Sequence, residues 1–479
     1  MSELPPGWAL ATIDDLIADN GIFVDGDWVE TKDQDPTGDV RLTQLADVGD
    51  GFWRNRSDRR MTSSAADRLG CTPLMVDDVL VARMPEPLGR ACLFPGDQRT
   101  CVTVVDVAIV RPGSDSVSPR WLMWAINAPE VRSAIGAQQA GTTRKRISRT
   151  NLGAIPLPTA PRAEQERIVV AIEEAFSKLG AGEGGLRTVR QLLKRIRDAI
   201  LDAAVAGRLV AQDPADTPAT DLADFDTEPI DPITSRALPD GWACVRVGDC
   251  LGRIEAGKSF ATLGRPAVDG EVGVIKVSAM TWGEFRPEEN KAIPLDSKID
   301  ERWTIRGGDL LFSRANTSEY VGACVLVPQD HPGLILSDKS LRLVPIAGVS
   351  AEWLLLALRS RPAREQIERH ATGTKESMRN VSQAKLRSIE IAVPPPEEQV
   401  RIVSEVDRQV SFIAACERAV DAGLAQSAAL HRSVLKSAFE GHLVPQDPTD
   451  EPASVMLERI RDQRDAAPKA NSRRSGVKA

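Results

Sequence analysis

The side chains best suited to chemistry in this sequence are cations that stand beside small polar residues. Arg54-Asn55-Arg56 offers two guanidinium groups and an amide, which can make paired hydrogen bonds to the edges of guanine and adenine. Thr142-Thr143-Arg144-Lys145-Arg146 follows a glycine, and its hydroxyls and positive charges suit phosphate groups. Thr374-Lys375 is a weaker counterpart, diluted by Glu376. These clusters predict contacts with nucleic acid.

Three further polar residues are candidates for the same surface, because each lies just past a run of β-forming residues. Arg83 follows one such run, and Arg314 and Asn316 follow another. A charged surface side chain is more often only solvated, so the prediction concerns the regions that hold these residues more than any one side chain.

The segment Gly252–Ser259 satisfies the phosphate-loop pattern GxxxxGK[ST] and would, taken alone, indicate a nucleoside triphosphatase. A phosphate loop must lead into a helix at its Lys-Ser pair, but Ser259–Pro266 has the composition of a turn. No apolar strand ending in Asp follows to bind magnesium. We interpret the match as a coincidence in a β-rich loop.

Residues for nucleophilic catalysis or metal binding are too scattered to form a site. The seven cysteines include no CxxC pair, and no GxSxG motif occurs. A methyltransferase would need a Gly-rich cofactor loop and an Asn/Asp-Pro-Pro-aromatic motif, and neither is present. We therefore expect no catalytic residue and no metal site on this chain. The four histidines are His331, His370, His431 and His442.

The 479 residues carry a formal net charge of −8, which at first argues against a nucleic-acid ligand. The acidic residues are concentrated, because Ala211–Asp240 contains eight of them beside the single cation Arg236. The rest of the chain is close to neutral, so DNA is not excluded. No apolar run approaches the ~20 residues that cross a bilayer, and the N-terminus has no secretory signal, so we expect a cytoplasmic protein.

An internal repeat organises the chain. Three motifs recur at one offset of 234 residues: LPPGW as LPDGW, EQERIV as EQVRIV, and GRLVAQDP as GHLVPQDP. The first copies begin at Leu4, Glu164 and Gly207. The interiors, 20–68 and 251–302, share almost nothing. Similar ends around different middles predict one scaffold that carries two different recognition surfaces.

The second part of each repeat is helical. Apolar residues recur at heptad spacing in both copies, and a pair of such stripes predicts that the two helices pack against each other. Gly180, Gly182, Gly184 and Gly185 predict a break or kink in the first helix, whereas the second copy should run straight. The expected packing residues are Leu186, Val189, Leu193, Ile196, Ile200, Val406, Ile413, Val420 and Val434.

These patterns predict an α+β protein with two globules, two helical regions and two connecting segments. The acidic segment should be an exposed connector, and the small, basic residues 466–479 should be disordered. The expected boundaries are 1–157 and 238–392 for the globules, 158–210 and 393–445 for the helical regions, 211–237 for the acidic linker and 446–479 for a C-terminal tail.

The repeated LPxGW openings, the basic loop containing Gly-Thr, and the EQxRIV motif entering a long helix resemble the specificity subunits of type I restriction–modification enzymes. The resemblance covers essentially Leu4–Pro448. It implies that each globule is a target recognition domain that reads half of a bipartite double-stranded DNA site. It also implies that the two helices pack antiparallel as a rigid spacer, with a pseudo-twofold relation between the copies. Lys258 would then contact DNA rather than a nucleotide.

The same resemblance implies a non-catalytic subunit within a larger complex. It would recruit two adenine-N6 methyltransferase subunits and, in a full enzyme, two restriction subunits. S-adenosylmethionine, ATP and magnesium would bind those partners, and this chain would hold no cofactor. Two alternatives stay open: a structural coiled-coil adaptor without DNA affinity, and, less favoured, a nucleoside triphosphatase that uses the phosphate-loop match. The diverged interiors weigh against a symmetric adaptor.

Overall fold

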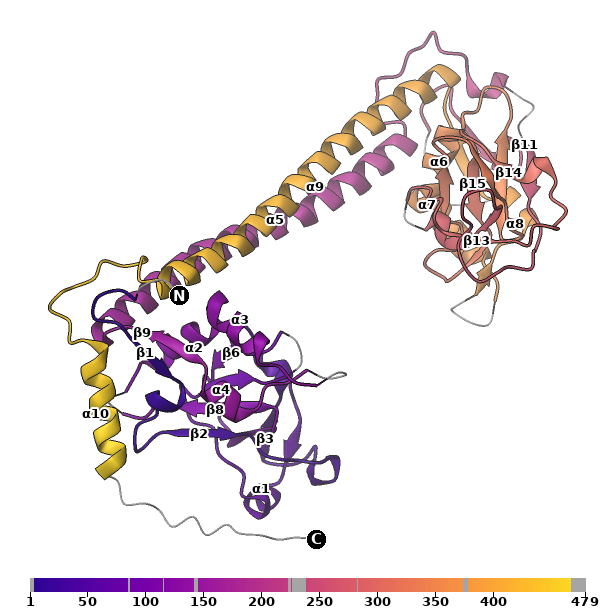
Figure 1. Ribbon diagram of the computed structural model, residues 1–479. Coiled ribbons are helices and arrows are strands. Elements are labelled where there is room, and N and C mark those ends of the chain that lie inside the picture. The colour runs from indigo at the N-terminus through magenta and orange to yellow at the C-terminus, as the bar shows by residue number, and fades with distance from the viewer. Residues whose placement is uncertain are drawn as a thin grey trace. The chain divides into compact units, whose positions relative to one another are not determined.

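The computed structural model divides the chain into two compact units. Unit 1 combines Met1–Arg187 with Asp421–Ala479, and unit 2 is Thr188–Val420. Each unit contains a globule and one half of each of two long helices, α5 (Arg162–Val205) and α9 (Pro396–Phe439) (Figure 1). The expected α+β architecture is therefore confirmed. The structure describes residues 4–84, 87–114, 116–141, 145–222, 225, 238–281, 283–373 and 378–466.

The globule of unit 1 packs α2, with its two tryptophans, against a four-stranded sheet of order β2-β8-β5-β6. A second sheet, β4-β3-β7, and the pair β1-β9 complete it. The central strand β5 (VLVA) is apolar and fully buried, because the sheet is covered on both faces. The elements are β1 (Ala9–Thr12), β2 (Ile22–Asp25), β3 (Val40–Thr43), β4 (Arg60–Met61), α1 (Ser63–Leu69), β5 (Val79–Ala82), β6 (Ala91–Leu93), β7 (Cys101–Thr103), β8 (Val107–Arg111), α2 (Pro119–Asn127), α3 (Pro129–Ala137), α4 (Arg149–Gly153), β9 (Pro156–Thr159) and α10 (Ala453–Ala466).

The globule of unit 2 has the same framework, in sheets of order β11-β19-β15-β17 and β13-β12-β18-β14 with the pairs β10-β21 and β16-β20. Among the described strands, each globule has one parallel strand pair, β3 with β7 and β12 with β18. The elements are β10 (Ala243–Arg246), β11 (Leu251–Ala256), β12 (Gly273–Ile275), β13 (Asn290–Ala292), β14 (Thr304–Ile305), β15 (Leu310–Ser313), β16 (Ala315–Asn316), β17 (Cys324–Leu326), β18 (His331–Ile335), β19 (Ser340–Pro345), α6 (Ala351–Arg359), α7 (Arg361–His370), β20 (Arg379–Asn380), α8 (Gln383–Arg387) and β21 (Glu390–Val393).

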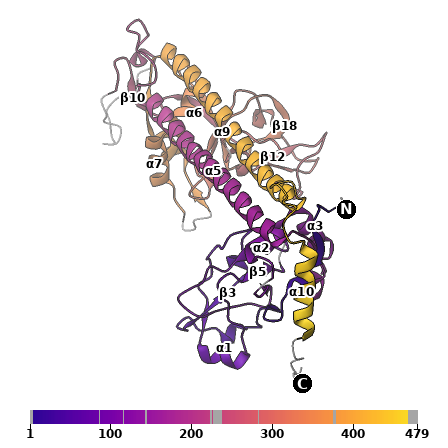
Figure 2. The ribbon, with the colours of Figure 1, turned by 90° about the vertical axis from the view of Figure 1, so that its left-hand side faces the viewer.

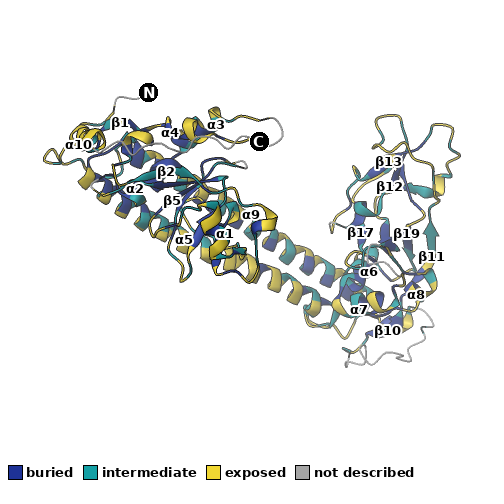
Figure 3. Ribbon diagram, turned by 90° about the horizontal axis from the view of Figure 1, so that it is seen from below, coloured by how far each residue is buried: buried dark blue, intermediate teal, exposed yellow. Residues whose placement is uncertain are grey.

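The halves of α5 and α9 run antiparallel within each unit. In unit 1, Ser427 Oγ donates to Glu183 Oε1 at 2.8 Å, and in unit 2, Arg197 Nη2 donates to Glu417 Oε2 at 2.8 Å. Positions therefore rise along one helix as they fall along the other. The facing sides are buried and the outer sides are exposed (Figure 3). In the described part of the chain, no helix is both long and apolar enough to cross a membrane.

The buried seam between the helices is narrower than the heptad pattern suggested. Five of the expected packing residues are buried, and Leu186 and Val434 are partly buried. Val189 and Ile196, however, are 42% and 40% exposed, so the expectation fails there. Only one stripe of α5 can face a single partner helix, and the ion pair of Arg197 with Glu417 lies beside it. The five buried residues are Leu193, Ile200, Val406, Ile413 and Val420.

The expected break at the glycine cluster does not occur. Helix α5 runs without interruption through all four glycines, and α9 is also continuous, as predicted. The partner helix supplies the missing stability, since Leu186 lies against Gly423 of α9, and tertiary packing can override low helix propensity. A Cβ built on Gly180, Gly182, Gly184 or Gly185 would meet no atom within 4 Å.

The repeated motifs fasten each helix to its globule. Trp8 Nε1 donates to Glu164 Oε2 at 3.0 Å, and Trp242 Nε1 donates to Glu398 Oε2 at 2.9 Å. The adjacent Gln165 caps the start of α2 by accepting from the backbone N–H of Ser118 at 3.0 Å. Burial raises the pKa of both the Glu164 and the Glu398 carboxyls, although the indole N–H opposes the shift. The LPxGW and EQxRIV motifs therefore contact each other where the helix joins the globule.

The segment after each helix docks on the globule at the same junction. Arg167 Nη2 lies 2.6 Å from Asp450 Oδ2 in unit 1, and Arg401 Nη1 lies 3.0 Å from Asp216 Oδ1 in unit 2. The described part of the acidic segment, residues 211–222 and 225, is mostly exposed, but it is anchored at Asp216 and at the buried Ala219. Of the basic tail, residues 467–479 lie outside the described residues.

A helix within the C-terminal region was not predicted. Helix α10 packs beside the globule of unit 1 (Figure 2). Met456 and Ile460 are buried in the unit 1 core, and Arg464 Nη1 donates to the carbonyl of Asp14 at 2.9 Å. The C-terminal region therefore contributes to the same core as the N-terminal strands.

We predict that changing all four glycines of the cluster to Ala stabilises the protein, because each Gly costs up to about 1 kcal/mol in a helix and the added methyls meet nothing. Urea denaturation should show a higher midpoint. Gly207→Ala is the contrasting variant, since Gly207 has φ +65° and its Cβ would lie 2.3 Å from Pro239 Cγ. A lower midpoint for the fourfold variant would contradict this account of α5.

Candidate nucleic-acid interface

The two predicted basic loops lie at matching positions in the two globules. In unit 1, a β-bridge between Ala140 and Arg146 closes the loop, and the backbone N–H of Ile147 donates to the carbonyl of Arg83 at 3.1 Å. Lys145 is exposed on this loop. The structure thus brings Arg83 to the base of the loop predicted to bind phosphate. Thr142, Thr143 and Arg144 lie outside the described residues.

Unit 2 repeats this arrangement. Thr372 forms a bridge with Asn380, and the backbone N–H of Val381 donates to the carbonyl of Arg314 at 2.9 Å. Asn316 pairs with Arg379 in the β16–β20 ribbon, so both Arg314 and Asn316 lie at the base of this loop. Thr374 and Lys375 lie outside the described residues.

The two arginines at the loop bases differ in their surroundings. Arg83 Nη2 lies 2.6 Å from the carbonyl oxygen of Val105 and 3.1 Å from Asp25 Oδ1, and its side chain is only 12% exposed. This guanidinium therefore braces the loop base, and the contact of Arg83 with DNA stays a prediction. Arg314 is half-buried at the equivalent position.

Polar atoms without partners gather beside Arg314. Among the described residues, Asn316 Nδ2, Thr317 Oγ1 and Asn380 Oδ1 are buried and make no hydrogen bond. Asn316 Oδ1 accepts from the backbone N–H of Thr317 at 2.9 Å, which fixes the orientation of its amide. Buried polar atoms need partners, and water or a polar ligand can supply them. The base of the unit 2 loop consequently has hydrogen-bonding capacity to spare.

The cluster Arg54-Asn55-Arg56 lies on a loop that follows β3 and a short 3-10 turn, Leu45–Asp47. Asn55 has φ +51°, a left-handed backbone conformation that Asn tolerates better than most residues. Asn55 and Arg56 are exposed, and the Arg54 guanidinium lies 5.6 Å from the centroid of the Phe52 ring. Phe52 is itself 57% exposed. The loop thus presents an amide, two cations and an aromatic ring to solvent.

Two further arginines reinforce this positive surface and were missed in the sequence. Burial lowers the pKa of the Arg90 guanidinium, and the positive charges of Arg54 and Arg132 lower it further. Arg132 Nη1 lies 2.6 Å from Asp50 Oδ1, which offsets part of the repulsion. Arg90 precedes β6 and Arg132 lies on α3, so both are far from the 54–56 loop in sequence. No local pattern could have grouped them.

The phosphate-loop match is structurally wrong for a nucleotide site. Five of its eight residues, 252–256, belong to strand β11, which pairs with β19, and Lys258 forms a parallel bridge with Ser337. Residues 259–272, all of which the structure describes, contain no helix that could bind phosphate at its N-terminus. Lys258 is exposed, and its assignment to DNA remains a prediction.

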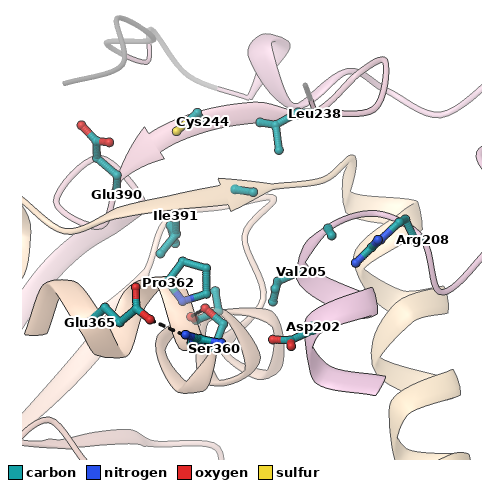
Figure 4. A pocket seen from close by; sticks show the side chains of 14 residues that line it. Asp202, Val205, Arg208, Leu238, Cys244, Ser360, Pro362, Glu365, Glu390 and Ile391 are labelled. Atoms are coloured by element: carbon teal, nitrogen blue, oxygen red, sulfur yellow. Dashed lines mark hydrogen bonds and ion pairs between the residues drawn. The ribbon is translucent and has the colours of Figure 1, made fainter. Parts of the chain in front are cut away.

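A pocket of about 820 Å³ lies in unit 2 between the end of α5, the β10–β21 pair and the start of α7 (Figure 4). Asp202, Glu365 and Glu390 contribute its carboxylates, and Val205 projects from the last turn of the helix. At the equivalent position in unit 1, Phe439 is buried with its ring 5.8 Å from that of Trp121. The smaller Val205 therefore leaves space that an aromatic ring fills in the other copy. Arg208 and Arg361 also line the pocket, and Arg361 pairs with Glu365, so the lining carries charges of both signs.

Comparison with known proteins supports the interpretation of the repeated motifs. Residues 239–418 match the family model of the type I restriction modification DNA specificity domain. The chain is 24% identical to the type I restriction enzyme EcoEI specificity subunit of Escherichia coli, over 87% of this chain and 79% of the relative. It is 25% identical to the EcoKI specificity subunit of Escherichia coli strain K12, over 70% of each chain.

Two solved structures share the fold. The HsdS subunit from Thermoanaerobacter tengcongensis covers 92% of this chain and 98% of its own length, with 19% identity and a TM-score of 0.54. A chain from a structural study of complex assembly and conformational transition in a type I R-M system covers 92% of this chain and 100% of its own, with 18% identity and a TM-score of 0.64. The resemblance inferred from the repeated motifs is thereby confirmed: the chain is similar to the specificity subunits of type I restriction–modification enzymes, and its residues 239–418 match their DNA specificity domain.

Proposed function

We propose that this chain reads an interrupted double-stranded DNA site, one half with each globule, on behalf of the methyltransferase and restriction subunits of a type I enzyme. The observation that carries the proposal is the repetition of one framework with two unlike surfaces. A four-stranded sheet of the same pattern and the helix junctions recur in the two units, whereas residues 20–68 and 251–302 share almost no sequence. A specificity subunit needs this combination, because the scaffold must be constant while the two half-sites differ.

The long helices are suited to the role of a spacer. Each has 44 residues, and a helix of that length measures about 66 Å. A single globule can contact only a few base pairs, but two globules on a common spacer add their base-contact energies over a longer site. We infer that the gap between the half-sites is set by helix length and is therefore constant.

The chemistry of modification and cleavage belongs to the partners in this proposal. The chain is the non-catalytic member of the complex, and we place S-adenosylmethionine, ATP and magnesium on two methyltransferase and two restriction subunits. In the described ranges, no group of three or more His, Cys, Asp or Glu residues is placed to hold a metal. Action on cellular DNA would place the complex in the cytoplasm.

The adaptor hypothesis explains less of the structure. A purely structural adaptor would need the helix pair and the junctions, but not an exposed loop bearing Arg54, Asn55 and Arg56 or a basic loop in each globule. The nucleoside triphosphatase hypothesis loses its only support, because the phosphate-loop match is largely a β-strand.

We predict that replacing Arg54, Arg56, Arg144 and Lys145 together by Ala weakens DNA binding by the reconstituted methyltransferase complex. The logarithm of the affinity should also fall less steeply with the logarithm of salt concentration, by about 0.9 for each phosphate that the variant no longer neutralises. The matched control replaces Arg120 and Arg162, which form surface ion pairs with Glu173 and Glu166 in the same unit. If the fourfold variant binds DNA as the control does, the interface is not here.

A second prediction concerns the spacer. Deleting one heptad from α5 and one from α9 should change the gap between the half-sites, by up to about three base pairs, because seven helical residues span about 10 Å. Deleting a whole heptad preserves the seam of buried residues, so the two half-sites should stay the same. Adenine methylation mapped by single-molecule sequencing measures both quantities. Altered half-sites with an unaltered gap would exclude the spacer role.

A further inference from the structure

The loop that carries Arg54, Asn55 and Arg56 is held in place by one buried carboxylate, that of Asp47. This side chain has no exposed surface. Its Oδ1 accepts from the backbone N–H groups of Arg56 at 2.6 Å and Ser57 at 2.8 Å, and its Oδ2 accepts from that of Gln44 at 2.8 Å. The backbone carbonyl of Asp47 accepts from the N–H of Arg54 at 2.8 Å. Both ends of the predicted base-reading tripeptide are therefore tied to one residue.

A buried arginine balances the charge of this carboxylate. Arg41 on β3 has a side chain only 7% exposed, and its Nη2 lies 3.5 Å from Asp47 Oδ1 and 2.9 Å from the carbonyl oxygen of Ser57. Its Nη1 donates to Asp97 Oδ2 at 3.0 Å. The guanidinium also lies 5.6 Å from the centroid of the Trp53 ring. Buried charged side chains therefore hold the loop in place.

This buried network acts on the exposed loop through the hydrogen bonds of Asp47 to the loop backbone. Asn55 lies between the tied residues in a left-handed conformation, which Asn tolerates better than most residues but which the bonds on either side help to hold. Hydrogen bonds to base edges need donors and acceptors held within about 0.5 Å. Contacts to phosphate tolerate more movement, because charge attraction depends weakly on direction.

We infer that Asp47 is the positioning residue for base recognition by unit 1, through the backbone of Arg56 and Ser57, without touching DNA. The inference rests on the proposed function and adds the element that gives unit 1 its specificity. Asp47 is fully enclosed, so it cannot itself touch a phosphate or a base edge. Any change of sequence specificity on its substitution must therefore pass through the loop.

The test is Asp47→Asn in the complete methyltransferase complex, because Asn keeps the shape but removes the charge that Arg41 balances. We expect discrimination in one half-site to fall by roughly tenfold at one or more bases. The other half-site and the gap should be unchanged. Arg56→Ala should relax the same half-site, which identifies it as the half read by unit 1. Affinity for non-specific DNA and its salt dependence should equal those of the wild type, because the side chains that bind phosphate are unchanged in Asp47→Asn.

Asp78→Asn is the matched control. Asp78 is also fully buried in unit 1, accepts from the backbone N–H of Met75 at 2.8 Å, and pairs with Arg111 at 2.6 Å, but it bonds no residue of the 54–57 loop. It should lower stability without relaxing specificity. If both variants relax the half-site equally, the effect is general destabilisation and the inference is overturned.

A milder variant covers the case in which Asp47→Asn does not fold. Asp97→Asn weakens the support of Arg41 from a carboxylate that is 14% exposed, and it should relax the same bases to a smaller degree. Unchanged half-sites in the folded variants would overturn the inference. A wild-type complex that methylates no interrupted site would instead overturn the proposed function itself.

Discussion

The attachment of each long helix to its globule is the constraint on which the rest of the structure depends. A globule can read DNA at a defined place only if it cannot rotate relative to the helix that carries it. The attachment is made by a buried carboxylate at the start of each helix, Glu164 or Glu398, whose partner is the indole N–H of a tryptophan from the opening strand region. Burying these carboxyls is costly, and the raised pKa of each records that cost. The bond fixes the position of the tryptophan relative to the start of the helix.

The contacts at the junction also explain why some motifs recur in both copies of the repeat while the sequence between them differs. The arginine of the EQxR motif holds the segment that follows the other long helix, through Asp450 in unit 1 and Asp216 in unit 2. The motifs at the junctions are therefore fixed by mutual contact across distant parts of the chain. The sheets between them need only apolar residues of suitable size, and the loops on their surface are free to differ. One scaffold can in this way carry two unrelated DNA-reading surfaces.

Local patterns in the sequence predicted the features that depend on local physics. The repeat, the α+β class and the helix pair all follow from spacing and residue type. The features that were missed depend on contacts between distant segments. Arg90 and Arg132 join Arg54 only in the folded chain, and the buried Asp47 looks like any other Asp in the sequence. The glycines of α5 predicted a break, because the supporting helix α9 is more than 200 residues away.

The measurement that tests the central claim most directly is the adenine methylome of a host that expresses the methyltransferase partner with and without this chain. The account predicts methylation on both strands of an interrupted, two-part motif that appears only when this chain is present. Methylation that is the same with and without the chain, from a partner shown to be active, would contradict it and would return the adaptor hypothesis to first place.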